Sequence, residues 1–262
     1  MKNMAKKEKS EKKRILPENI FATTHTGLIR DSNEDSYAYC TPGKGQNVIV
    51  AVADGIGGHE NGDIASRLCL RTILIEWRRK KMWSEKSIRK IEDFLGKAIA
   101  EANKEIYKLN LSFNVQQPMG TTLVLAVITS DKIAVAHAGD SRFYRYDGKT
   151  MKSLTRDHSF VEELVLKKII TREEAKDHPF SHVISRCVGT ADELEPEINV
   201  FKRADGEKYF LCSDGLISHL DDEKLCEIIS LSKDICETVR NLLYAALKKG
   251  GDDNITVLSV FP

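Results

Sequence analysis

The sequence predicts an α+β protein in which antiparallel sheets lie between layers of helices. Short apolar runs rich in Val and Ile occur at the beginning, in the middle and at the end of the chain, as expected for buried strands. Two pairs of segments with apolar residues at helical spacing separate these runs. The resulting order is strands, two helices, strands, two helices and a final strand, which is typical of sheets enclosed by helical layers.

The first half of the chain has the clearest patterns. Residues 64–77 have apolar side chains at helical spacing, including Ile64 and Ile75, and residues 87–109 form a second, longer amphipathic pattern. Strands are predicted at residues 21–26, 37–40 and 48–53 before this helix pair, and at 123–128 and 133–138 after it.

The second half contains a polar segment between two groups of regular elements. Residues 155–190 are polar and include two short helical patches, which is consistent with a mobile insert over a site. A hairpin over 142–154 precedes this segment, and strands and helices follow it at 197–201, 208–212, 222–231, 234–249 and 255–260. We find no internal repeat and no domain boundary, so residues 20–262 are expected to form one domain.

Charge is distributed unevenly along the chain. The 262 residues carry a net charge of +1, but residues 1–14 contain seven basic and two acidic residues. Residues 1–19 are therefore predicted to be a solvated, disordered tail, with an electrostatic tether to an anionic partner or membrane surface as the alternative. Because the remainder is net negative, we do not expect a nucleic-acid-binding domain.

The chain is predicted to be a cytoplasmic monomer. No run of about eighteen apolar residues could cross a membrane, and no apolar segment follows the charged N-terminus as it would in a signal peptide. The six cysteines are widely separated and include no CxxC pair, so free thiols in a reducing compartment are expected. Nothing in the sequence requires more than one copy of the chain.

Acidic residues mark the ends of four predicted buried strands. The strand at 48–53 ends in Asp54 and passes into a glycine-rich turn, and the other three acidic ends are Asp140, Asp214 and Asp253. Carboxylates brought to strand ends from four distant parts of the chain indicate one shared site. Like charges raise each other's pKa, so such a cluster needs a neutralising partner. Hard divalent cations such as Mg²⁺ and Mn²⁺ prefer oxygen ligands, and the sequence therefore predicts a metal centre.

Each of these features also has a simpler explanation. An Asp-Gly pair after a strand is the commonest kind of turn, so one such motif by itself favours a turn over a ligand. By itself, His59 is more often a polar loop residue than a catalytic one, and an isolated Arg30 is more often part of a surface ion pair. The repetition of the strand–Asp arrangement favours the shared site. His25, His137 and His158 are interpreted as structural.

With these residues identified, the chain resembles the metal-dependent protein phosphatase family (PPM, protein phosphatase type 2C), and in particular its compact bacterial members. The resemblance extends from about Thr23 to Val260, and seven motifs in the family's order make it highly specific. The motifs are Thr26-Gly27-Leu28-Ile29-Arg30 with Asn33-Glu34-Asp35, Asp54-Gly55-Ile56-Gly57-Gly58-His59, Met119-Gly120-Thr121-Thr122, Gly139-Asp140-Ser141-Arg142, Ser185-Arg186-Cys187-Val188-Gly189, Cys212-Ser213-Asp214-Gly215-Leu216 and Asp253-Asn254-Ile255-Thr256.

The resemblance implies a four-layer αββα sandwich of two antiparallel sheets flanked by helix pairs, with the metal centre at one edge. It further implies that Asp54 bridges two Mn²⁺ or Mg²⁺ ions and that the carbonyl of Gly55 binds one of them. Asp214 and Asp253 would hold the other ion.

The resemblance also assigns roles to the surrounding residues. Asp140, together with Asp214, would form a weaker third metal site, and Asp35 would act mainly through metal-bound water. Arg30 would clamp the phosphate with its planar fork, and His59 would be the proton donor to the leaving alkoxide. Two metals about 3.5–4 Å apart would activate the attacking water near neutral pH. The insert at residues 155–190 would be the flap beside the site.

The implied activity is hydrolysis of phosphoserine and phosphothreonine in proteins, reversing a Ser/Thr kinase, and this kinase and its targets would be the partners. Two other functions are open: the same centre could hydrolyse a small phosphorylated molecule, or a catalytically dead member could serve as a scaffold. The presence of Asp54, Asp214 and Asp253 favours an active enzyme. The sequence departs from the family at Ile56, where bacterial members usually have Met, and at Lys168, where the flap often has Gly.

Overall fold

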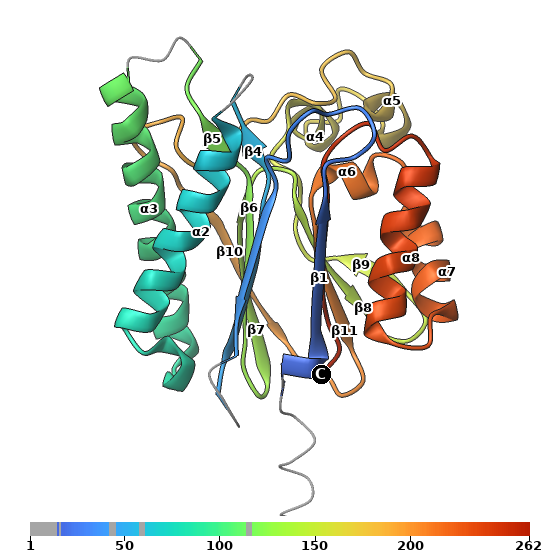
Figure 1. Ribbon diagram of the computed structural model, residues 1–262, viewed down its shortest axis with the longest axis horizontal. Coiled ribbons are helices and arrows are strands. Elements are labelled where there is room, and N and C mark those ends of the chain that lie inside the picture. Colours follow the sequence, from blue (N-terminus) through green and yellow to red (C-terminus); the bar gives the residue numbers. More distant parts are fainter. Residues whose placement is uncertain (1–14, 16, 42–45, 58–60, 114–116) are drawn as a thin grey trace, which may run out of the picture.

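The computed structural model describes residues 15, 17–41, 46–57, 61–113 and 117–262. Two five-stranded antiparallel sheets are stacked face to face, and helices cover the outer face of each sheet (Figure 1). The predicted α+β class and the four-layer αββα sandwich are confirmed. A two-stranded ribbon lies at one end of the sandwich (Figure 1).

All neighbouring strands in both sheets are antiparallel. The first sheet has the strand order β1 (Ile20–His25), β12 (Ile255–Val260), β11 (Lys208–Cys212), β8 (Arg142–Tyr146) and β9 (Met151–Ser153). The second sheet has the order β10 (Glu197–Lys202), β7 (Lys132–Ala138), β6 (Leu123–Ile128), β3 (Val48–Ala53) and β2 (Ser36–Cys40). The ribbon consists of β4 (Gly55–Ile56) and β5 (Gly120–Thr121).

Helices form the two outer layers. The second sheet is covered by α2 (Gly62–Arg79) and α3 (Ile88–Phe113), with the short 3-10 helix η2 (Met82–Ser84) between them. The first sheet is covered by α6 (Asp214–Ile217), α7 (Asp222–Leu231) and α8 (Ile235–Lys248). The predicted flap contains α4 (Phe160–Leu166) and α5 (Arg172–Lys176) and lies at the ribbon end of the sandwich (Figure 1). None of the helices in the described ranges is long and apolar enough to cross a bilayer.

Strand β3 is buried on both faces, as its continuous apolar run predicts. Val50 belongs to the core between the two sheets together with Phe143 and Leu211. The alternate residues Ile49 and Ala51 belong to the core that the second sheet shares with α2 and α3. This central strand is therefore held from both sides, and the residue that follows it has little freedom to move.

The face through which helix α2 packs matches the predicted one only in part, because Ala65 and Leu70 are buried as expected but Ile64 and Ile75 are not. Ile64 and Ile75 are 47% and 51% exposed. Four of the buried residues recur at every fourth position, namely Ala65, Cys69, Ile73 and Trp77, and Gly62, Ser66 and Leu70 are buried beside them. Gly55 in the ribbon lies against the backbone of Gly62 so closely that a Cβ at either residue would collide with the other segment. The start of the helix is therefore held directly against the ribbon.

The folded structure begins before the boundary predicted at Ile20. Ile15 is buried in the core between the sheets. Residues Pro17–Asn19 form the 3-10 helix η1, and the carbonyl of Asn19 accepts a hydrogen bond from the Phe261 amide (2.8 Å). The local sequence does not reveal this start, because a single Ile is buried here by strands from distant parts of the chain. Residues 1–14, on which the predicted tail and tether depend, lie outside the described residues.

The strand registers bring the acidic strand ends to one end of the sandwich. In the second sheet, Ala138 at the end of β7 pairs with Leu123 at the start of β6, and β3 runs antiparallel to β6. In the first sheet, Cys212 at the end of β11 pairs with Val257 near the start of β12. The ribbon, which follows β3 and precedes β6, lies at this same end (Figure 1). The residues that follow β3, β7 and β11 and precede β12 therefore gather there.

Lys168, which stands where the family often has Gly, has a left-handed backbone conformation. Lys168 follows α4 and has φ of 57°. Its amide donates to the carbonyl of Val165 (2.9 Å), and the Ile169 amide donates to that of Leu164 (2.9 Å), which together form a Schellman motif. Glycine is favoured at this position because a Cβ destabilises the left-handed conformation. The lysine keeps the same helix end as glycine would.

We expect Lys168→Gly to change the free energy of unfolding by less than about 1 kcal/mol, because relief of backbone strain and the greater freedom of the unfolded chain offset each other. Lys168→Val should destabilise by roughly 1–2 kcal/mol, because a β-branched residue tolerates a positive φ poorly. Urea unfolding of both variants measures the difference. Equal stability of the two variants would contradict the left-handed geometry.

Candidate metal centre

Five aspartates gather where the strands end. Asp54 follows β3, Asp140 follows β7, Asp214 begins α6 after β11, Asp253 precedes β12 and Asp35 precedes β2. Burial raises the pKa of Asp54 well above its ordinary range, and the charges of Asp35, Asp214, Asp140 and Asp253 raise it further, in that order of size. The structure therefore brings together all five carboxylates predicted as metal ligands.

Asp35 is held through only one of its two oxygens. Its Oδ2 accepts a hydrogen bond from Ser213 Oγ (2.7 Å), and Ser213 Oγ in turn accepts one from the Thr256 amide (2.9 Å). The other oxygen, Oδ1, is buried and finds no hydrogen-bond partner among the described residues. Burial raises the pKa of Asp35 to about 7. A buried carboxylate with an unused oxygen is costly unless an electropositive group meets it.

Asp140 and Asp214 show the same need for a cation. Asp140 Oδ1 is buried and, within the part of the chain that the structure describes, has no hydrogen-bond partner. Burial, followed by the charge of Asp214, raises the pKa of Asp140 to about 8. Burial and the charge of Asp253 likewise raise the pKa of Asp214. The donor atoms of this cluster are all oxygens, so the residues present fit hard divalent cations such as Mg²⁺ and Mn²⁺.

The five carboxylates include one close pair, because the side chains of Asp54 and Asp214 lie within hydrogen-bond distance of each other. Over residues 15, 17–41, 46–57, 61–113 and 117–262, three possible ligand atoms come within 4.8 Å of one another only at His137, His158 and Glu197, and not among the aspartates. Because like charges repel, holding three such oxygens closer together requires a bound cation.

The backbone of Asp54 is fixed by two threonines. Its amide donates to Thr122 Oγ1 (3.1 Å), and its carbonyl accepts from the Thr122 amide and from Thr121 Oγ1 (both 2.8 Å). Gly55, the predicted carbonyl ligand, follows in the ribbon and pairs with Thr121. Sequence analysis quoted the motif at Thr121 and Thr122 without assigning it a role. The structure shows that these two residues orient Asp54.

Arg30 lies at the rim of the cluster. Its Nη2 donates to Asp253 Oδ2 (2.8 Å), and its side chain is 58% exposed. The loop that carries Arg30 is fastened by Asn254, whose side-chain amide donates to the carbonyls of Thr26 (2.8 Å) and Ser32 (2.9 Å). Sequence analysis assigned no role to Asn254. The only available signal was its place in the motif that follows Asp253.

Two histidines are relevant to the metal centre, one predicted and one not. The predicted proton donor His59 lies outside the described residues, so its role stays a prediction. His182, in the flap, lies close enough to Asp214 for its charge to lower the pKa of that carboxyl. Sequence analysis missed His182, because only the folded flap brings it near Asp214.

Comparison with known proteins agrees with this geometry. Residues 26–249 match the family model described as Protein phosphatase 2C. The chain belongs to the protein phosphatase 2C family. It is 36% identical over 237 residues to the "Serine/threonine phosphatase stp" of Listeria innocua, and the match covers 90% of this chain and 93% of that protein.

Solved structures of protein phosphatase 2C relatives have the same fold. Stp1 from Staphylococcus aureus is 28% identical with a TM-score of 0.84, over 93% of this chain and 94% of that chain. The catalytic domain of the phosphatase PstP, solved in complex with two manganese ions, is 31% identical with a TM-score of 0.78, over 92% of this chain and 96% of that chain. As a member of this family, the protein is a metal-dependent protein-serine/threonine phosphatase.

The raised pKa values predict how the stability of the metal-free phosphatase depends on pH. Asp35 and Asp140 keep their protons up to about pH 7 and about pH 8 in the folded state, but an unfolded aspartate loses its proton near pH 3.9. Between these limits the folded state binds more protons than the unfolded state. The stability gained from these two groups is therefore complete below about pH 4 and is lost as pH rises to about 8.

We expect the Tm of the protein in EDTA to fall as pH rises from about 5 to 8, and Mn²⁺ or Mg²⁺ to reverse this trend, because the cations bind the ionised carboxylates. Differential scanning calorimetry with and without metal measures both effects. The Asp140→Asn variant should show a shallower decline in EDTA, because one raised pKa is removed. A Tm in EDTA that rises steadily over this range would contradict the assignment of these pKa values.

Proposed function

We propose that the phosphatase hydrolyses phosphoserine and phosphothreonine at the cluster of Asp54, Asp214 and Asp253, with Arg30 as the phosphate-binding group. The observation that supports this most strongly is the convergence of carboxylates from distant parts of the chain beside an exposed arginine. Such a cluster repels a phosphate dianion unless cations neutralise it, so metal binding and phosphate binding are linked at this site.

Two Mn²⁺ or Mg²⁺ ions are proposed to occupy the centre, with Asp54 as the shared ligand. The carbonyl of Gly55 would contribute to one ion, and Asp214 and Asp253 would hold the other. When bound, the ions supply a Lewis acid and a water molecule of lowered pKa. The chain's own contribution is to hold the carboxylates rigidly, through the buried strand β3 and through the threonines that fix the backbone of Asp54.

The two remaining aspartates are proposed to have weaker or indirect roles. Asp140, with Asp214, would form a third and weaker metal site. Two observations support this role: Asp140 Oδ1 has no hydrogen-bond partner among the described residues, and the charge of Asp214 raises the pKa of Asp140. Asp35 would act mainly through water, because one of its oxygens is already engaged by Ser213 Oγ.

Arg30 and His59 are proposed to act on the phosphate group directly. The guanidinium of Arg30 would exchange Asp253 for the phosphate, because its planar fork matches two phosphate oxygens and its exposed position leaves it accessible. His59, which lies outside the described residues, would donate a proton to the leaving serine or threonine oxygen.

The cellular setting is also part of the proposal. The natural partners of such an enzyme are a Ser/Thr kinase and its phosphorylated targets, because the phosphatase reverses the kinase reaction. Residues 20–262 would act as one catalytic domain in a monomer, with residues 155–190 as its flap. All six cysteines are free thiols, which agrees with a reducing cytoplasm.

We expect Asp54→Asn to reduce turnover of a phosphothreonine peptide to the level seen in EDTA, because an amide supplies neither the charge nor the second oxygen needed to bridge two cations. Asp205→Asn is the matched control, since Asp205 is exposed in the turn between β10 and β11, at the opposite end of β11 from Asp214. Hydrolysis is measured with Mn²⁺, with Mg²⁺ and with EDTA. Full metal-dependent turnover by Asp54→Asn would refute the proposed site.

Arg30→Ala should lower kcat/KM for the same peptide by about ten- to a hundredfold, because hydrogen bonds to charged groups contribute roughly 1.5–3 kcal/mol. Arg30→Lys should recover only part of this loss, since an ammonium group lacks the planar fork. Steady-state kinetics at saturating Mn²⁺ separate the effect from metal binding. An Arg30→Ala enzyme with unchanged kcat/KM would show that this arginine serves only as the ion-pair partner of Asp253.

A further inference from the structure

His137, His158 and Glu197 form a second polar group, which the metal centre does not use. His137 on β7 pairs in register with Glu197 on β10. His158 lies just before the flap helices, and its ring stacks on that of His137 with centroids 4.5 Å apart and planes 15° from parallel. One possible ligand atom from each residue lies within 4.8 Å of the other two. The group could therefore be a second metal site or a structural arrangement.

The hydrogen bonds argue against a metal ion in this group. His137 Nε2 lies 2.7 Å from the carbonyl oxygen of Arg156, so this nitrogen carries the ring proton. His158 Nδ1 accepts a hydrogen bond from the Gly139 amide (3.3 Å), so the proton of the neutral ring is on Nε2, the nitrogen that faces Glu197 at 3.5 Å. A metal ligand needs a free lone pair on that nitrogen. The nearly parallel rings also have no common in-plane point at which an ion could bind both.

His158 holds the turn that carries Asp140. The Gly139 amide donates to His158 Nδ1 (3.3 Å), and the His158 amide donates back to the Gly139 carbonyl (2.9 Å). On its other side, Gly139 packs so closely on Thr122 that a Cβ would strike the threonine side chain at 2.6 Å. Asp140 therefore lies in a turn clamped between His158 and Thr122, and Thr122 is also the residue that fixes Asp54.

The same histidine joins the two chain segments at the base of the flap. The His158 carbonyl accepts a hydrogen bond from the Ser185 amide (2.8 Å). The next residue, Ser159, forms an antiparallel bridge with Ile184. The flap helices lie between these two segments, so a displacement of the flap base displaces the backbone of His158.

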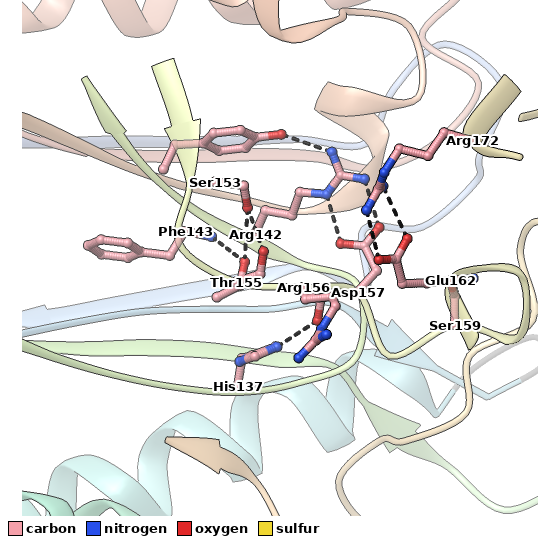
Figure 2. Close-up of polar contacts among 11 residues, drawn as sticks. His137, Arg142, Phe143, Ser153, Thr155, Arg156, Asp157, Ser159, Glu162 and Arg172 are labelled. Carbon is pink, nitrogen blue, oxygen red and sulfur yellow. Dashed lines mark hydrogen bonds and ion pairs between the residues drawn. The ribbon is translucent and has the colours of Figure 1, made fainter. Parts of the chain in front are cut away.

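The segment before His158 is tied to both sheets, as Figure 2 shows. Asp157 accepts two hydrogen bonds from Arg142 of β8 in the first sheet (2.8 and 2.7 Å). The carbonyl of Arg156 is bound by His137 of β7 in the second sheet. Arg156 and Asp157 are therefore anchored to the two sheets, and His158 is the next residue, at the point where the chain enters the flap.

We propose that His158 is a positioning residue that couples the flap to the turn carrying Asp140. Its side chain is hydrogen-bonded to the turn that carries Asp140 and its backbone is hydrogen-bonded to the base of the flap, so the turn and the flap base move together. The position of the flap would then set how well Asp140 binds its cation. This inference rests on the proposed function of Asp140 as a ligand of the third, weaker ion.

Three substitutions distinguish the effect of the hydrogen bond between the Gly139 amide and His158 Nδ1 from the effect of side-chain packing. In His158→Asn the side-chain Oδ1 takes nearly the place of Nδ1 and can still accept the Gly139 amide, whereas His158→Leu removes the acceptor and keeps an apolar side chain of comparable size. His178→Leu is the matched control, because His178 is a flap histidine whose ring packs on Phe160 and Phe180 and not on the Asp140 turn.

Mn²⁺ binding to the full chain, counted by isothermal titration calorimetry, is the first measurement. His158→Leu should weaken the weakest site by about tenfold or more, as is typical when a group behind a ligand is removed, and leave the two tighter sites unchanged. His158→Asn should retain most of the affinity, and His178→Leu should retain all of it. Equal weakening in the Leu and Asn variants of His158, or of all sites together, would overturn the proposal.

A double-mutant cycle with Asp140→Asn tests whether His158 acts through Asp140. In the Asp140→Asn background the weakest site is already lost, so His158→Leu should cause no further change in Mn²⁺ binding. A loss of affinity as large as in the wild-type background would show that His158 acts elsewhere. Stoichiometric Zn²⁺ binding that disappears in Glu197→Gln would also overturn the proposal, because the group would then be a metal site.

Amide hydrogen exchange distinguishes a failure of this inference from a failure of the proposed function, because it requires neither metal nor turnover. In EDTA, His158→Leu should exchange faster than wild type both at residues 139–141 and at Ser185, whereas His178→Leu should not. Unchanged exchange at residues 139–141 would overturn the coupling even in an active phosphatase. Absence of phosphopeptide turnover by the wild type would instead refute the proposed function and leave the exchange result standing.

Discussion

Repulsion among buried aspartates is the constraint on which the rest of this structure depends. Burial and the charges of neighbouring carboxylates raise the pKa of Asp54 well above its ordinary range, and Asp35 and Asp140 are similarly affected. A chain can hold like charges together only if the backbone that carries them resists their separation. Strand β3, buried on both faces, and strands β11 and β12, inside the first sheet, supply that rigidity. Divalent cations then find a site whose ligands are already gathered.

Neutral groups orient the carboxylates. Asp54 is held by threonine hydroxyl and backbone groups, Asp35 by Ser213, and the Arg30 loop by the side-chain amide of Asn254. A permanently charged partner would compete with the cations for the same oxygens. Arg142 is close enough for its charge to oppose the rise in the pKa of Asp140, but its guanidinium is bound to Asp157, whereas Arg30 pairs with Asp253 at the exposed rim. Neutral groups inside the site leave its carboxylates available to divalent cations, and under the proposed function the exposed Arg30 would bind the phosphate group.

The base of the flap is connected to the metal centre by hydrogen bonds. Two ties, Arg142 to Asp157 and His137 to the Arg156 carbonyl, anchor the entering segment to both sheets. The next residue, His158, then contacts the Asp140 turn through its ring. The surroundings of Asp140 therefore include the base of the flap. Under the proposed coupling, contacts of a substrate with the flap would reach the turn that carries Asp140 by this route.

Sequence alone determined the elements and the carboxylates, because both depend on local information. The apolar run at 48–53 specifies a strand buried on both faces, and the order of the motifs identifies the family that supplies the ligand set. Tertiary structure decided part of the buried face of α2, the burial of Ile15, and the contacts that Asn254, His158 and His182 make near the metal centre. The reason is that a local pattern records what a residue prefers, whereas its partner can come from anywhere in the chain. Asn254 and Ser32, which share a hydrogen bond at the metal centre, are 222 residues apart.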